Sequence, residues 1–196
     1  MPDISDIPFG LIGKAYTLYK DRKLDSALER LRQEGVTVEE LKKNDYRFSA
    51  FMRMADALDT CSSNQMMNFL VDYLIAGVAT SSIDDKPDLY QSVLSNLGKL
   101  TEIEVEILGR MREKNMREGT SADAFVKGAE LEIWVAERVG ISEDAAQALI
   151  VGIGRSGFTQ SRHSSFCDLG RRSTMSHRLT DMADMLLDLV YERTRL

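Results

Sequence analysis

The 196-residue chain has few of the residues on which disulfide scaffolds and histidine-based active sites depend. It contains two cysteines, Cys61 and Cys167, and two histidines, His163 and His177. The cysteines lie 106 positions apart, and we expect them to be free thiols in a reducing compartment. Both histidines fall in one polar segment, which argues against a buried catalytic histidine.

Long apolar runs and prolines are also scarce. The most apolar run covers residues 69–79 and contains Asp72, so it is too short and too polar to cross a bilayer. The N-terminus has neither the basic region nor the apolar region of a signal peptide. We therefore expect a cytoplasmic protein with no membrane partner. Three prolines and ten methionines favour helix over strand.

Helix signals recur along the whole chain. Three segments have the spacing of a capping box, namely Thr37–Glu40, Ser62–Gln65 and Thr101–Glu104. Pro87 suits the first turn of a helix, and glycines at 35, 98 and 140 suit helix ends. Apolar spacing predicts a wide buried face, and hence a central helix, from Met66 to Val78. It also places Met52 and Ile133 on the inward faces of two other helices, whereas the apolar residues of the first helix, such as Leu18, only partly keep a helical period.

The segment Gly152-Ile-Gly-Arg-Ser-Gly157 matches the dinucleotide fingerprint G-x-G-x-x-G. That fingerprint must be followed by a helix, whose N-terminus faces the pyrophosphate. The residues after Gly157 are polar and aperiodic instead, and only 39 residues remain in the chain. We interpret the segment as a helix with tolerated glycines, and we expect no cofactor.

A metal site has equally little support. His163, Cys167 and His177 are the candidates, but only His163 and Cys167 have a ligand-like spacing, and a fourth ligand is missing. A surface loop explains these residues better, so we expect no metal. The sequence contains no HExxH, no Walker motif and no G-x-S-x-G elbow, and we expect the protein not to be an enzyme.

The C-terminal half follows the plan of a winged helix-turn-helix unit. Helices are predicted over 101–115, 121–139, 142–156 and 180–193, with a tight turn at Gly140. Residues 158–160 and 175–179 are predicted to pair as a short β-hairpin, the wing. The predicted fold is therefore mainly α: an N-terminal helical bundle (1–98) packed on a winged-helix-like region (99–196).

The hairpin and its surroundings are basic in an otherwise acidic chain. Residues 154–180 carry a local charge of +4 although the whole chain carries −6. The five arginines, which are the predicted contact residues, are Arg155, Arg162, Arg171, Arg172 and Arg178. Arginines in a wing suit contact with DNA phosphates, and they suit an acidic protein surface equally well. The helix before the wing begins with Glu143 and Asp144, which weakens any prediction of base readout.

Several segments are similar to the abortive-infection alpha family. They are residues 64–77, 86–90 and 94–108, together with the closing helix that starts Leu179-Thr-Asp-Met-Ala183, where the family has glycine in place of Ala183. The resemblance covers roughly residues 62–193. It implies a helical bacterial or phage-associated protein linked to phage defence, and it gives no catalytic residues to carry over.

Two functions fit these observations. The first is a non-enzymatic regulatory or interaction module that contacts nucleic acid through the basic wing. The second is a structural protein whose basic loop pairs with the acidic face of a partner or of another copy, as a homo-oligomer. A solvated loop that balances an acidic surface also accounts for the arginines.

Overall fold

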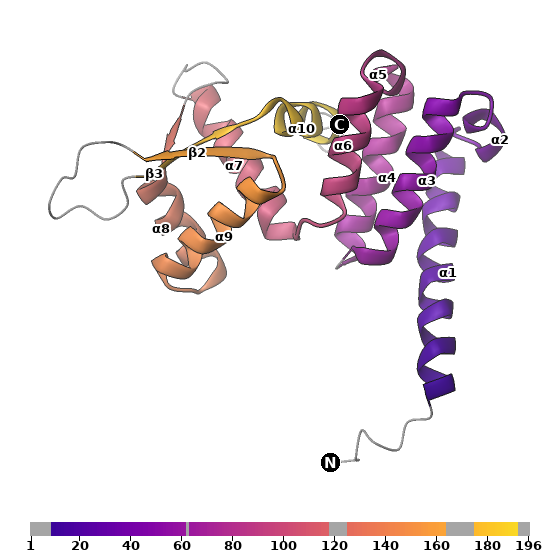
Figure 1. The fold of residues 1–196 in the computed structure, drawn as a ribbon, viewed down its shortest axis with the longest axis horizontal. Coiled ribbons are helices and arrows are strands. Elements are labelled where there is room, and N and C mark those ends of the chain that lie inside the picture. The colour runs from indigo at the N-terminus through magenta and orange to yellow at the C-terminus, as the bar shows by residue number, and fades with distance from the viewer. Residues whose placement is uncertain (1–8, 62, 118–124, 164–174, 192–196) are drawn as a thin grey trace, which may run out of the picture.

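The computed structural model describes residues 9–61, 63–117, 125–163 and 175–191. Within these ranges the chain is mainly helical and contains one small antiparallel sheet (Figure 1). None of the described helices combines the length and the apolar character that crossing a membrane requires.

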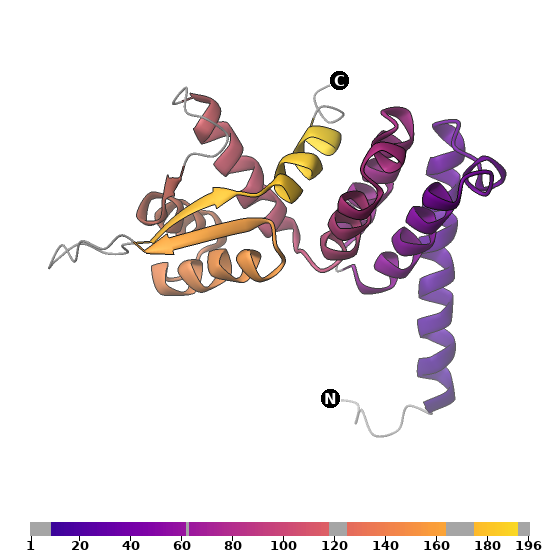
Figure 2. The same cartoon turned by 45° about the horizontal axis from the view of Figure 1, so that its top comes forward.

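The N-terminal part is a bundle of helices. They are α1 (Phe9–Gln33), α2 (Val38–Leu41), α3 (Asp45–Thr60), α4 (Asn64–Ala79), α5 (Ser82–Asp85) and α6 (Pro87–Leu97). Helix α3 packs against α4 and α6, and α1 packs against α3 and α4. The N-terminal half of α1 extends beyond the other helices (Figures 1 and 2). Leu18 is accordingly exposed, which agrees with the weak helical period of this segment.

The capping signals mark most of the helix starts correctly. Thr37 and Glu40 form the predicted reciprocal capping box, and α6 begins at Pro87. The box predicted at Ser62 is wrong, because Ser63 is the N-cap of α4 and its hydroxyl accepts from the Met66 N–H at 3.1 Å. At Thr101 half of the box forms: the Glu104 carboxylate accepts from the Thr101 N–H at 2.7 Å.

Helix α4 is the central helix, as its apolar face predicts. Residues around most of its circumference are buried, including Leu70, Val71 and Leu74. The rings of Tyr73 and Tyr90 stack with centroids 4.4 Å apart, and the Tyr90 hydroxyl donates to the Tyr73 carbonyl at 2.7 Å. This contact fixes α4 against α6 in the middle of the core.

The C-terminal half alternates helices with a three-stranded sheet. Its elements are α7 (Glu102–Arg117), β1 (Val126–Lys127), α8 (Gly128–Val139), α9 (Glu143–Arg155), β2 (Thr159–His163), β3 (Met175–Leu179) and α10 (Asp181–Tyr191). The sheet order is β1-β3-β2, and both pairs are antiparallel. Thr159 lies opposite Leu179 and His163 opposite Met175, which confirms the predicted β-hairpin and extends its first strand.

The predicted helix over 121–139 is wrong in its first part. Residues 121–124 lie outside the described chain, Val126 and Lys127 form β1, and the helix begins only at Gly128. Its buried face was also misassigned, because Leu131 and Val135 are buried while Ile133 is exposed. Met52 of α3 was misassigned in the same way.

Helix α10 connects the two halves of the molecule. It follows β3 directly and packs against α4 and α6 of the bundle as well as against α7 (Figures 1 and 2). Ala183, Leu186, Leu187 and Val190, which share one helical face, are buried, and so is Leu189. The last helix of the chain therefore completes the core that the N-terminal helices begin.

Candidate nucleic-acid interface

The turn before α9 is built as its sequence predicts. Gly140 adopts a left-handed φ of +76°, a conformation that side chains rarely tolerate, and it ends α8. The Ser142 hydroxyl then accepts from the Ala145 N–H at 3.3 Å and caps α9. Two consecutive helices are thus joined by a short turn, and α9 leads through Gly157 into β2.

The outward surface of α9 carries acidic side chains at its start and small side chains along its middle. Asp144, Ala145 and Ala148 are exposed, and the first cation that the helix exposes is Arg155 at its end. The amide of Gln147 is directed to the Met175 sulfur at 3.7 Å. This surface offers few of the long polar side chains with which helices read base edges.

The glycines of the G-x-G-x-x-G segment form no phosphate-binding loop. Gly152 and Gly154 lie inside α9, and among these three glycines only Gly157 has a left-handed φ, of +83°. The helix ends where the fingerprint requires one to begin. The interpretation as a helix with tolerated glycines therefore agrees with the structure.

One face of the sheet is turned toward the helices and buries His177. The Nδ1 atom of His177 lies 2.8 Å from the Ser161 hydroxyl, and its Nε2 has no hydrogen-bond partner among the described residues. Burial holds the pKa of His177 below its ordinary value. His177 lies on β3, where the predicted hairpin places it, but it is buried, which the polar character of the segment did not indicate. His177 and Leu179 are two residues apart on β3, so their side chains lie on the same face of the sheet, and both are buried.

The other face of the sheet gathers cations. In β3, Ser176 and Arg178 alternate with the buried His177 and Leu179, so they point away from the helices. Residues opposite each other in a pair share a face, and Arg178 lies opposite Gln160. In the same way Ser176 lies between Lys127 on β1 and Arg162 on β2. We call the set Lys127, Arg162 and Arg178 the basic sheet face.

An aromatic ring positions the two arginines of this face. The Arg162 guanidinium lies 3.8 Å from the centroid of the Phe125 ring, and that of Arg178 lies 5.5 Å from it. Arg178 also donates from Nε to the Gln160 side-chain oxygen at 2.7 Å. Attraction between a cation and a ring at exposed sites contributes about 0.5–1 kcal/mol, which suffices to favour one side-chain orientation.

The two arginines of the basic sheet face have no carboxylate partner within the described chain. No carboxylate of the described residues forms an ion pair with Arg162 or Arg178. Nearby, Lys114 donates a hydrogen bond to Glu130 and thereby lowers its pKa, with a smaller contribution from the charge of Lys127. The face can therefore attract an anion from outside.

The five predicted contact arginines have different locations. Arg162 and Arg178 lie together over Phe125, whereas Arg155 is exposed at the end of α9. Arg171 and Arg172 lie outside the described residues. Sequence reasoning missed Lys127 and Phe125, because residues 121–139 were interpreted as one helix; the signal available was the apolar Val126 between two outward residues, followed by a glycine.

The candidate metal ligands in the sequence were His163, Cys167 and His177, and the structure does not describe all of them. Cys167 lies outside the described chain, and His177 is buried beneath the sheet. Across the described ranges, no three His, Cys, Asp or Glu side chains lie close enough together to hold a metal ion.

Comparisons with protein-family models, with curated proteins and with solved structures gave no match to this chain. The resemblance to the abortive-infection alpha family therefore stays a prediction. The function must be argued from the geometry of the chain itself.

Proposed function

We propose that residues 99–196 form a winged helix-turn-helix unit that binds the phosphate backbone of double-stranded nucleic acid, as a non-enzymatic regulatory module. The helical bundle, residues 1–98, forms the other part of the protein. Support for the unit comes from the element order α7-β1-α8-α9-β2-β3, the tight turn at Gly140 and the β1-β3-β2 sheet. Its link to phage defence rests on the family resemblance alone.

The basic sheet face is the observation that carries the proposal. Three cations from three strands point to one side, and Phe125 orients two of them. Arginine and lysine contacts to phosphate release condensed counterions, so they support binding without sequence preference. The acidic start of α9 is consistent with such binding, because base readout by that helix is not required.

Fluorescence anisotropy with a labelled duplex of mixed sequence tests this proposal. We expect binding that weakens steeply between roughly 50 and 200 mM salt. Replacing Arg162 and Arg178 by glutamine removes two phosphate contacts, so the slope of log K against log salt should become shallower by about 1.8. Absence of binding at low salt would overturn the proposal.

A control variant with the same loss of charge distinguishes the effect of the basic sheet face on binding from the effect of net charge. Arg22→Gln combined with Lys43→Gln also removes two cations, and both residues are exposed in the bundle, away from the sheet. We expect the salt slope of this control to equal that of the natural chain. Equal losses in the two double variants would contradict a role for the basic sheet face.

A second function is favoured by the acidic start of α9. Asp144 is exposed and Glu143 precedes it, so the chain carries both a basic face and an acidic helix start that a second copy could pair with. We propose this self-association as the alternative. Sedimentation or light scattering without nucleic acid decides it: a mass that falls as salt rises supports the alternative, and a constant monomer mass excludes it. Both functions are proposed for the cytoplasm, where Cys61 stays a free thiol.

A further inference from the structure

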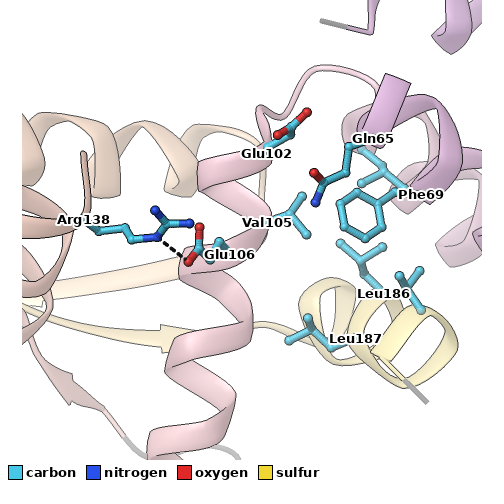
Figure 3. A pocket seen from close by; sticks show the side chains of 10 residues that line it. Gln65, Phe69, Glu102, Val105, Glu106, Arg138, Leu186 and Leu187 are labelled. Atoms are coloured by element: carbon cyan, nitrogen blue, oxygen red, sulfur yellow. Dashed lines mark hydrogen bonds and ion pairs between the residues drawn. The ribbon is translucent and has the colours of Figure 1, made fainter. Parts of the chain in front are cut away.

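A cavity of about 390 Å³ lies where the bundle meets the C-terminal half (Figure 3). Helices α4, α6, α7, α8 and α10 all contribute to its lining. Its volume falls within the range of small-molecule sites, about 300–1,000 Å³. Such sites often lie between parts of a protein, because an occupant there contacts several elements at once.

The walls of this cavity are apolar and fixed. Phe69 of α4, Val105 of α7 and Leu187 of α10 face it from three helices (Figure 3). Val105 and Leu187 are buried in the common core, so their side chains are held in place by packing. The walls can therefore cover the apolar body of a ligand without rearranging.

The polar side of the cavity carries two negative charges and one positive charge. Glu102 and Glu106 come from consecutive turns of α7, and Arg138 comes from α8. Arg138 donates from Nε to Glu106 at 2.8 Å, so this guanidinium already has a carboxylate partner. Glu102 has neither an ion pair nor a side-chain hydrogen bond within the described chain, which leaves the cavity with a net charge of −1.

We propose that this cavity binds an amphipathic small molecule that has an apolar body and one ammonium group. The body lies against Phe69, Val105 and Leu187, and the ammonium group lies beside Glu102. A carboxylate ligand fits less well, because Arg138 is neutralised by Glu106 and the free charge is negative. This inference concerns a different site from the basic sheet face and does not depend on nucleic-acid binding.

Two probes with the same body and opposite charges test the preference for ammonium. Dansylcadaverine ends in a primary amine, and dansyl-6-aminohexanoic acid ends in a carboxylate. Fluorescence titration of the full chain at low ionic strength is expected to show tighter binding of the amine. Equal or tighter binding of the acid would overturn the inference.

Isosteric substitutions at the polar side of the cavity show which charged side chain determines the affinity for the amine. Glu102→Gln should weaken amine binding roughly two- to fivefold, as expected for a partly exposed ion pair. Arg138→Gln frees Glu106 and should strengthen amine binding by a similar factor. Glu137→Gln is the matched control, because Glu137 is exposed on α8 but does not line the cavity, and it should leave binding unchanged.

A third variant tests whether the probes occupy this cavity at all. Gln65 is exposed at its edge, so Gln65→Trp should fill the opening while the core stays intact. Both probes are then expected to lose binding, with an unchanged far-UV circular dichroism spectrum. If the Trp variant binds the amine as the natural chain does, the ligand site lies elsewhere and the inference fails.

Discussion

The buried His177 should make the stability of the protein depend on pH. Its side chain is fully buried, and burial lowers its pKa below the ordinary value of 6.5 in the folded chain. Well above pH 6.5 neither the folded nor the unfolded chain protonates it, so the full stability is present. Below pH 6.5 the unfolded chain gains a proton that the folded chain resists, and stability falls as the pH decreases toward the lowered pKa.

The size of this effect follows from linkage. One unit below the unfolded pKa, the unfolded chain gains at most about 1.4 kcal/mol from protonation of one histidine, provided that the folded pKa lies lower still. Stability at pH 5.5 should therefore be lower than at pH 7.5 by up to about 1.4 kcal/mol on account of His177. Below the folded pKa this contribution levels off.

Urea unfolding at several pH values measures the effect, with His177→Gln as the comparison. The glutamine variant is expected to be less stable overall, and its loss between pH 7.5 and pH 5.5 should be smaller by up to about 1.4 kcal/mol. An identical pH dependence in the two chains would refute the reasoning, as would an imidazole NMR titration of His177 with a midpoint at or above 6.5.

Three substitutions probe the packing and helix capping that stabilise the fold, and each is measured by urea unfolding. Gly77→Ala should cost about 1–3 kcal/mol, because the new Cβ would lie 2.4 Å from the Tyr90 ring; a neutral result would mean that the ring can shift. Gly128→Ala should cost at least as much, since its Cβ would lie 2.5 Å from the Met175 carbonyl oxygen, a backbone atom between α8 and β3. Ser142→Ala should cost about 1 kcal/mol through loss of the α9 cap, and an unchanged midpoint would contradict that capping role.

The helix boundaries could be predicted because their signals are local. Thr37, Pro87 and Gly140 each act within one turn of chain, through a cap, a fixed φ or a left-handed φ. The hairpin was predictable for a similar reason, since the residues of β2 and β3 lack helical periodicity. These features need no knowledge of distant contacts.

The inward faces and the shortest strand could not be predicted in this way. Strand β1 has two residues, too few for an alternating pattern, and it exists because Val126 pairs with His177 about fifty residues later. Ile133 and Leu131 are both apolar, so spacing alone does not decide which of them faces the core. The neighbouring elements decide it, and they come from other parts of the chain.

The candidate site changed in character for the same reason. Arg162 was predicted to lie between the two strands of the hairpin and Arg178 on the second strand, whereas the structure places both on paired strands beside Phe125. A cation on a strand, held over a ring, has less side-chain freedom to lose on binding than one in a loop, and immobilising such a side chain costs roughly 0.5–1.5 kcal/mol. Under the proposed function, preorganisation by Phe125 would increase the contribution of each phosphate contact. Phe125→Leu, which keeps both charges and removes the ring, should therefore weaken duplex binding while leaving its salt slope unchanged, whereas a shallower slope would show that the ring does more than orient the cations.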